Sequence, residues 1–227
     1  MSDIRFEQVG QRFGDRSVLH DVNLSLTEHR IGIVGANGSG KSTLVRMING
    51  LVTPSTGTVT VDGQNVARHA REVRRKVGFI FTNPDNQIVM PTVQEDVAFT
   101  LRRRGLTPAE IARRTAAALD QFGLSEHAEH PAHRLSGGQK QLLALAAVLV
   151  AEPATIVADE PTTLLDARNA RRIGNLLQTL PQQVIVVTHH LHLVEDFDRV
   201  IVIDEGTVLA DGAPQQSLAT YRSLLLA

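Results

Sequence analysis

The fold of this chain is decided by nine residues, Gly35-Ala36-Asn37-Gly38-Ser39-Gly40-Lys41-Ser42-Thr43. They match G-x-x-x-x-G-K-[ST], the pattern of the phosphate-binding P-loop. An apolar run at residues 31–34 precedes the stretch and a helix-like run at 44–48 follows it. Glycines let backbone N–H groups turn toward phosphate oxygens, and the following helix points its positive end at the same anion. Lys41 supplies charge for the terminal phosphates, and the Ser42 hydroxyl is suited to hold Mg²⁺.

The composition limits the possible classes of protein. The chain has 227 residues, of which 42% are hydrophobic, so it can bury a large core. Its 23 basic and 24 acidic residues nearly cancel, which argues against a nucleic-acid partner. The absence of cysteine excludes disulfides and thiol catalysis. The longest apolar run, residues 142–151, is far shorter than the roughly 20 residues of a membrane span, so we expect a soluble protein.

Strand-like segments occur at both ends of the chain. Near the N-terminus, apolar and polar residues alternate, and the expected inward positions are Val18, His20, Val22, Leu24 and Leu26. Residues 58–63 form another short strand that ends in a turn. Continuous apolar runs at 77–81, 155–158 and 184–187 are each followed by polar residues, which predicts buried parallel strands with chemistry at their carboxyl ends. Two more strands are expected at 199–203 and 207–210, followed by a short helix.

The middle of the chain, residues 92–150, is predicted to be helical. Thr92 and Glu95 have the spacing of a capping box, as do Thr107 and Glu110. A third such pair, Ser136 and Gln139, lies in the stretch Leu135-Ser136-Gly137-Gly138-Gln139-Lys140-Gln141. Because two glycines leave the backbone bare at this helix start, it is a good second phosphate clamp.

Polar residues follow two of the buried strands. The strand at 155–158 ends in Asp159 and Glu160, and His189 follows the strand at 184–187. Asp159 is placed to bind the Mg²⁺ shell, Glu160 to polarise an attacking water, and His189 to bond the γ-phosphate or that water.

Together these motifs resemble the ATP-binding cassette (ABC) ATPases over nearly the whole chain. The resemblance implies an α/β P-loop NTPase in which residues 1–227 form one ABC ATPase domain. Its parts would be a RecA-like core with an N-terminal antiparallel β subdomain (1–82 and 153–227) and an inserted α-helical subdomain (83–152). It also implies ATP and Mg²⁺ as cofactors and ATP hydrolysis coupled to transport across a membrane.

The family's functional residues carry over position by position. Residues 35–43 match the Walker A loop and 135–139 the signature motif, which includes Ser136, Gly137, Gly138 and Gln139. Asp159 matches the Walker B aspartate, Glu160 the catalytic glutamate, Asp166 the D-loop aspartate and His189 the switch histidine. Phe13 lies where the family often stacks an aromatic ring on adenine, although it is also a plausible core residue.

The resemblance also implies partners. In the family two cassettes pair head to tail, so that each ATP lies between the Walker A loop of one subunit and the signature of the other. The chain has one copy of each motif, and a homodimer is the simplest way to complete both sites. Residues 79–87 and 92–99 resemble the ATPases of energy-coupling factor (ECF) importers of vitamins and metals. That branch implies a transmembrane coupling subunit, a small substrate-binding membrane subunit and a peripheral location at the cytoplasmic face of the membrane.

The cargo is not decided by these motifs. The short length and local sequence are most similar to biotin importers, and a cobalt or nickel importer is the nearest alternative. The chain stops soon after Gly212, which predicts that dimerisation relies on ATP and the membrane partner. A conventional ABC importer, a soluble cassette acting on DNA or ribosomes, and a P-loop kinase are further alternatives. The 83–87 segment argues against a conventional importer. A soluble cassette usually has a coiled-coil insertion or a second cassette in the chain, and neither occurs here. The signature motif argues against a P-loop kinase.

The chain departs from the family pattern in three places. Thr82 occupies the position of a glutamine that contacts Mg²⁺ or water, so we expect a water to bridge Thr82 to the metal, or Asn83 to substitute. Leu142 replaces a common arginine after the signature, and Leu164 and Leu165 replace smaller D-loop residues. The histidine sets 127/130/133 and 189/190/192 lack the further ligands of a metal site, and Pro131 interrupts the first set. His189 is better explained by its position at a strand end, and His190 and His192 by a solvated helix start.

Overall fold

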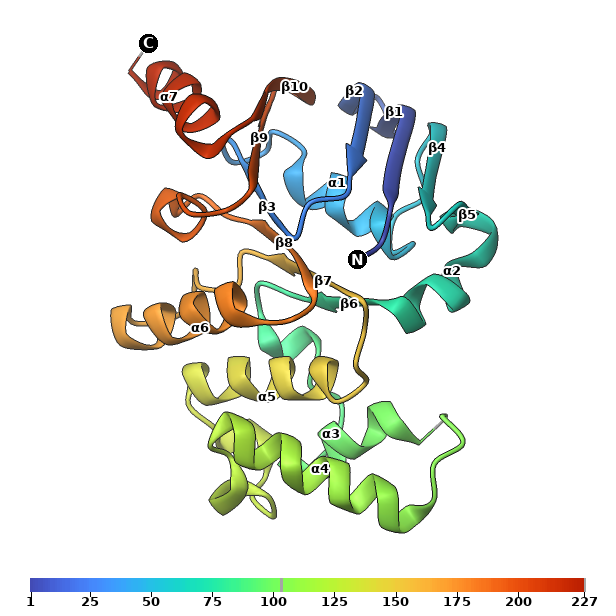
Figure 1. Cartoon of the computed structure of the whole chain (residues 1–227), viewed down its shortest axis with the longest axis vertical. Helices are drawn as coiled ribbons and strands as arrows, with labels where there is room; N and C mark the ends of the chain where they lie inside the picture. Colours follow the sequence, from blue (N-terminus) through green and yellow to red (C-terminus); the bar gives the residue numbers. More distant parts are fainter. Residues whose placement is uncertain (103, 227) are drawn as a thin grey trace. The chain divides into compact units, whose positions relative to one another are not determined.

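The computed structural model describes residues 1–102 and 104–226. Packing divides the chain into two compact units, which are described separately below. The first comprises Met1–Gly78, Ala154–Glu160 and Leu177–Ala227, and the second comprises Phe79–Pro153 and Pro161–Leu176. Figure 1 labels their elements.

The first unit contains an antiparallel sheet in the order β2-β1-β4-β5, and its strands are labelled side by side in Figure 1. Its strands are β1 (Ile4–Phe13), β2 (Arg16–Leu26), β4 (Thr56–Val61) and β5 (Gln64–Asn65). The predicted N-terminal antiparallel β region is therefore confirmed.

The alternation predicted for β2 is only half right. Val22, Leu24 and Leu26 are buried as expected, but the next inward side chain is Leu19, not His20. Asp21 adopts a positive φ of 45°, and the pairing of β1 with β2 shifts register at this point. A bulge of this kind places two residues opposite one, so the side chains beyond it change faces.

The second sheet has the order β10-β9-β3-β8-β7-β6. Its strands are β3 (Arg30–Val34), β6 (Val77–Ile80), β7 (Thr155–Asp159), β8 (Gln183–Val187), β9 (Arg199–Asp204) and β10 (Thr207–Gly212), and the chain enters the second unit within β6. Strands β7, β8, β3 and β9 are parallel neighbours, and β10 is antiparallel to β9. Every residue of β3, β7 and β8 is buried, as expected for central parallel strands.

The first unit has three α-helices among its described residues: α1 (Lys41–Ile48), α2 (Val66–Lys76) and α7 (Pro214–Leu225). A short 3₁₀ turn, η4 (Leu191–Leu193), follows β8. The sequence indicated α1 and α7 but not α2. Only Val66 and Val73 of α2 are buried, and His69 interrupts its helical backbone, so the apolar stripe of this helix is too narrow to mark it in the sequence.

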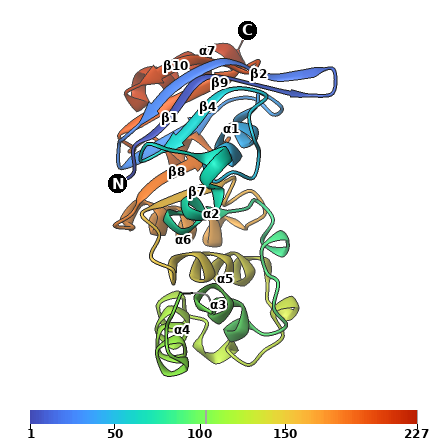
Figure 2. The same ribbon diagram turned by 90° about the vertical axis from the view of Figure 1, so that its right-hand side faces the viewer.

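The second unit is built on helices. It contains α3 (Val93–Leu101), α4 (Pro108–Phe122), α5 (Gly137–Leu149), α6 (Ala167–Thr179, up to Leu176), and the 3₁₀ turns η1 (Pro84–Asn86), η2 (Ser125–His127) and η3 (Ala132–Arg134). Helices α3, α4 and α5 pack on one another (Figure 2).

The caps predicted from the sequence begin these helices. Thr92 and Glu95 form a capping box at α3, and the Thr107 hydroxyl accepts a hydrogen bond from the Glu110 N–H at α4. In the described part of the chain, no helix combines the length and apolar character that crossing a bilayer requires.

The first prediction compares Gly57, which lies within β4, with Gly63, which lies just beyond its end and has nearly the same φ. Gly57 has φ +78° and Gly63 has φ +75°, but a Cβ at Gly57 would collide with backbone oxygens of Glu7 and Gln8, whereas a Cβ at Gly63 would meet open space. At both positions an alanine would be held in a left-handed conformation. Only the alanine at position 57 would also collide with the backbone of β1. We expect Gly57→Ala to lower the free energy of unfolding by about 3 kcal/mol and Gly63→Ala by about 1 kcal/mol. Urea denaturation measures both, and equal losses would show that the close approach of β1 is unimportant.

Candidate nucleotide-binding site

The topology of the parallel sheet brings three motifs to one edge. Strand β8 pairs with β3 on one side and β7 on the other, and all three run in the same direction. Their carboxyl ends therefore lie together. Val34 leads into the glycine-rich loop, Asp159 leads into Glu160, and Val187 leads into His189.

The loop at residues 35–40 is shaped to receive an anion. Its three glycines, Gly35, Gly38 and Gly40, all have positive φ, and α1 begins directly after them. A Cβ at Gly35 would collide with the Ile203 carbonyl oxygen, so this position is limited to glycine. The Ser39 hydroxyl oxygen is buried without a hydrogen-bond partner among the described residues, which leaves it available to a ligand.

A cavity of about 390 Å³ lies beside this loop. It is lined by Phe13, Arg16, Val18, Asn37, Gly38, Gly40, Lys41, Ser42, Thr43 and Glu160. Lys41 is only 6% exposed, and its Nζ donates a hydrogen bond of 2.7 Å to the Ala36 carbonyl. Burial lowers the pKa of Lys41, and the nearby carboxylates of Glu160 and Asp159 oppose that shift. Phosphate oxygens in this cavity would supply further negative charge to this buried ammonium group.

Asp159 is completely buried and bonded through both carboxylate oxygens. Its Oδ1 accepts from the Ser42 hydroxyl at 2.7 Å, and its Oδ2 is 3.0 Å from Nη2 of Arg46. A hydroxyl and a carboxylate are hard oxygen donors of the kind that Mg²⁺ prefers. Ser42 and Asp159 therefore fit the magnesium role expected from the sequence, and both are positioned by secondary structure.

Glu160 and His189 lie together at the ends of β7 and β8. Glu160 Oε2 is 2.9 Å from His189 Nδ1, and the Glu160 N–H donates to the Val187 carbonyl. Glu160 has a positive φ of 54°, which turns its side chain at the end of the strand. A carboxylate lining the cavity and hydrogen-bonded to an imidazole has the chemistry to accept a proton from water.

The turn between β1 and β2 contributes one expected residue and one unexpected residue. Phe13 is 53% exposed at the cavity, so its ring is accessible to a flat ligand. Arg16 also lines the cavity, and a Cβ built on Gly38 would lie 3.6 Å from its Nη2. Its charge adds to that of Lys41 near the loop. No motif marks a lone arginine 25 residues before Lys41, so the sequence did not indicate it.

The signature residues lie in the second unit, at the start of α5. Ser136 precedes the helix, its Oγ accepts from the Gln139 N–H at 3.3 Å, and Gln139 Oε1 accepts from the Ser136 N–H at 2.8 Å. The predicted capping box is present. Ser136 and Gly137 are exposed, so the N–H end of α5 is open to solvent.

Gly138 and Asp166 both contact the start of α6. A Cβ at Gly138 would lie 2.6 Å from the side-chain amide of Asn169, so the two fit closely. Asp166 accepts from the N–H groups of Arg168 and Asn169 and from the Asn169 side chain. These hydrogen bonds, with those from Asn169 largest, lower the pKa of the Asp166 carboxyl. Asp166 is thus held rigidly beside the signature by Asn169.

The segment of residues 82–87 is bound to the same helix, α5. Lys140 Nζ is 2.7 Å from Asp85 Oδ1, and the side-chain amide of Gln87 bridges the Phe81 N–H and the Ala144 carbonyl. Asn83 Oδ1 already accepts from the Asp85 N–H, at 3.0 Å. Thr82 belongs to the second unit and the magnesium candidates to the first, so its role toward the metal stays a prediction.

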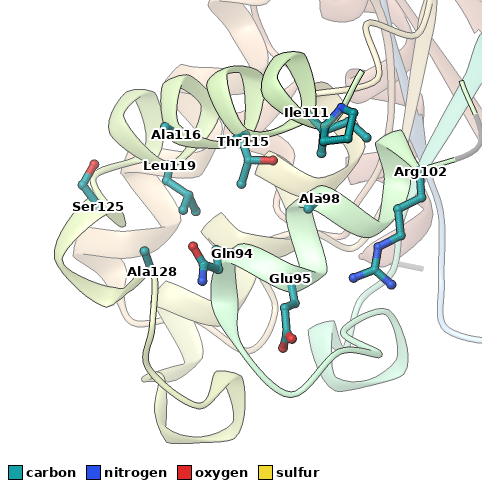
Figure 3. A pocket seen from close by; sticks show the side chains of 12 residues that line it. Gln94, Glu95, Ala98, Arg102, Ile111, Thr115, Ala116, Leu119, Ser125 and Ala128 are labelled. Atoms are coloured by element: carbon teal, nitrogen blue, oxygen red, sulfur yellow. The ribbon is translucent and has the colours of Figure 1, made fainter. Parts of the chain in front are cut away.

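A second cavity, of about 480 Å³, forms a groove between α3 and α4 (Figure 3). Its lining is mainly apolar or small, with charged groups on α3, and comprises Gln94, Glu95, Ala98, Arg102, Pro108, Ile111, Ala112, Thr115, Ala116, Leu119, Ser125 and Ala128. The Thr115 hydroxyl is buried without a hydrogen-bond partner among the described residues. We call this cavity the α3–α4 groove.

Comparisons with known proteins match these motifs. A family model described as "ABC transporter" matches residues 19–163. The biotin transport ATP-binding protein BioM of Rhizobium etli is 44% identical, covering 98% of this chain and 99% of its own length. The energy-coupling factor transporter ATP-binding protein EcfA1 of Caldanaerobacter subterraneus is 43% identical, covering 88% of this chain and 74% of its own length.

A solved structure gives the same result for the fold. The structure of cbiO1 from Clostridium perfringens, described as part of the ABC transporter complex cbiONQ, matches with a TM-score of 0.84 and 32% identity. The match covers 98% of this chain and 94% of that one. The P-loop NTPase fold and the resemblance inferred from the motifs are thereby confirmed, and the chain belongs to the ABC transporter family of ATP-binding proteins.

Proposed function

We propose that this chain is the ATP-hydrolysing subunit of an ECF-type membrane importer, with biotin as the favoured cargo. The observation that carries the proposal is the attachment of residues 82–87 to the signature helix through Asp85–Lys140 and Gln87–Ala144. This segment resembles the part of ECF ATPases that meets the membrane partner. A displacement of it would therefore be passed directly to the helix that begins at Ser136.

The first unit supplies the hydrolytic chemistry. ATP occupies the cavity beside the loop, with its phosphates on the backbone N–H groups and Lys41 and its adenine near Phe13. Bound Mg²⁺, held by Ser42 and Asp159, adds positive charge at the phosphates. Glu160 orients the attacking water and accepts its proton, and His189 holds the Glu160 carboxylate and stabilises charge at the γ-phosphate.

A second subunit completes each site. Ser136, Gly137, Gly138 and Gln139 would meet the nucleotide of a partner cassette, with Asp166 beside them. The open N–H end of α5 supports this role, because helix N-termini bind phosphate. A homodimer is proposed because one chain supplies both halves.

The α3–α4 groove is proposed to receive a helical segment of the transmembrane coupling subunit. Its apolar floor suits the nonpolar face of a helix, and the buried Thr115 hydroxyl offers a hydrogen bond that it lacks within the chain. Glu95, on α3, and Arg102, directly after its end, lie about two turns apart and line the groove, so a segment with an acid near Arg102 fits. Such contacts would hold this chain at the cytoplasmic face of the membrane.

The cargo assignment rests on similarity alone. BioM is named for biotin, and CbiO of Syntrophus aciditrophicus, which is 40% identical to this chain, is named for cobalt import, so a cobalt or nickel importer is the alternative. A conventional ABC transporter is a second alternative.

The chain should be tagged and its complex extracted from native membranes in mild detergent. A single coupling subunit with a small binding protein supports the ECF proposal, and the ligand of that protein identifies the cargo. Recovery of two large permease subunits, or of soluble partners only, would overturn it.

The second prediction concerns hydrolysis in this complex. Glu160→Gln removes the proton acceptor and keeps the side-chain size, so we expect the ATPase rate to fall about 10²- to 10⁴-fold while ATP still binds. Lys41→Met is expected to weaken ATP binding itself. Phosphate release and fluorescent-nucleotide titration separate the two effects. A Glu160→Gln protein that hydrolyses ATP at the normal rate would remove Glu160 from the mechanism.

The third prediction concerns the groove. Ala116 lines it, whereas the adjacent Ala117 is an exposed alanine of the same helix outside the lining. We expect Ala116→Glu to reduce co-purification of the coupling subunit at least about tenfold, because a carboxylate would be buried against an apolar segment. Ala117→Glu should have no effect. ATP binding should be normal in both variants, and equal co-purification would place the docking surface elsewhere.

A further inference from the structure

His127 is hydrogen-bonded to the signature motif from a separate turn of the second unit. Its Nε2 lies 2.9 Å from the side-chain nitrogen Nε2 of Gln139, and its Nδ1 lies 3.0 Å from Nδ1 of His130. Gln139 is in turn bonded to Ser136 in the capping box. The side chains of His130, His127 and Gln139 form one continuous hydrogen-bonded chain, which ends at the backbone N–H of the signature serine.

The direction of each hydrogen bond follows from the Ser136 end. The Ser136 N–H can only donate, so the group it meets is the oxygen of the Gln139 amide. The amide NH₂ therefore faces His127 Nε2, which must accept and carries no proton. The proton of neutral His127 is then on Nδ1, from which it donates to His130 Nδ1. Neutral histidine in water favours the tautomer with the proton on Nε2, so this network requires the less common Nδ1–H tautomer of His127.

The turn that carries His127 is anchored by its backbone. The N–H groups of Val93 and Gln94, at the start of α3, donate to the carbonyls of His130 and Ala128. The His130 N–H donates to the His127 carbonyl at 2.8 Å. His127 is therefore presented to Gln139 from a fixed base.

We propose that His127 is a positioning residue for the signature: it holds Gln139, and through it Ser136, in the geometry that meets a nucleotide on a second subunit. This inference rests on the proposed function of the signature. An acceptor at this place prevents the Gln139 amide from rotating away, so the capping box stays closed before the nucleotide arrives. The effect is pre-organisation of the nucleotide contact, which should appear in the KM for ATP more than in kcat.

The same turn borders the α3–α4 groove. Ser125 and Ala128, on either side of His127, line one end of that groove (Figure 3). An occupant of the groove would touch the turn that holds Gln139. His127 thus connects a partner surface with the signature by direct contact, without a long pathway.

The first test asks whether the hydrogen bond exists, independently of catalysis. Long-range ¹H–¹⁵N spectra of the full chain, labelled at histidine and recorded at slightly alkaline pH, report which ring nitrogen carries the proton. We expect the Nδ1–H tautomer for His127, changing toward Nε2–H in the Gln139→Ala variant. The Nε2–H tautomer in the unmodified chain would overturn the proposal, whether or not the protein hydrolyses ATP.

The second test measures ATP hydrolysis by the membrane complex with three variants. His127→Leu removes the acceptor, and we expect the KM for ATP to rise about threefold to tenfold, the effect of one lost hydrogen bond. His127→Gln offers a carbonyl oxygen instead and should restore most of the loss. His133→Leu, at an exposed histidine of the same segment, is the control and should change neither constant.

The outcomes separate the two proposals. If the unmodified complex shows no ATPase activity, the proposed function fails, while the tautomer still decides the His127 contact. If the complex is active and His127→Leu and His127→Gln behave alike, or His133→Leu behaves like His127→Leu, the positioning role is wrong. The comparison requires that the variants have equal thermal stability. If His127→Leu unfolds, the KM for ATP of His127→Gln is compared with that of the unmodified complex. A KM close to that of the unmodified complex supports the positioning role, and a strongly raised KM overturns it.

Discussion

The nucleotide end of the first unit depends on one buried carboxylate. Asp159 is inaccessible to solvent at the end of β7, and an unpaired charge there would be strongly destabilising. Ser42 and Arg46, one turn apart on α1, both bond to it and so attach the helix that follows the P-loop to the strand that precedes Glu160. The loop geometry, the residues proposed to bind Mg²⁺ and the position of Glu160 therefore all depend on this contact.

The second unit solves a different problem, since Ser136 and Gly137 at the start of α5 are exposed and cannot rely on burial. Several local contacts hold it: the capping box of Ser136 and Gln139, the fit of Gly138 against Asn169, and the bonds from Asp85 and Gln87 to α5. Each is modest alone, of the order of 1 kcal/mol. Their concentration around one helix start gives a rigid exposed surface, which is what binding a rigid phosphate group requires.

Much of this architecture could be predicted because its signals are local. The P-loop, the capping boxes and the apolar runs of β7 and β8 are each contained in a few consecutive residues. The Asp21 bulge could not be predicted, because a positive φ at an aspartate leaves no pattern, and it reversed the expected roles of Leu19 and His20. Helix α2 has only a narrow apolar stripe, in which Val66 and Val73 are buried, among mostly charged residues. Arg16 and His127 acquire their roles only through partners distant in sequence, which no single motif displays.

The two candidate half-sites are each built from contacts within a single unit. In the first unit Ser42 is bonded to Asp159 and Glu160 to His189, and in the second unit Gln139 is bonded to both Ser136 and His127. A change in the relation between units would thus leave the geometry of each half intact and alter only whether the halves meet around a nucleotide. In the proposed homodimer, opposed copies of one chain would supply both kinds of half-site, so ATP binding would control association, and hydrolysis would reverse it, without rebuilding either half. Energy transfer to a partner would then need only a contact that senses this rearrangement, and we propose that the segment bonded to α5 through Asp85 and Gln87 is that contact.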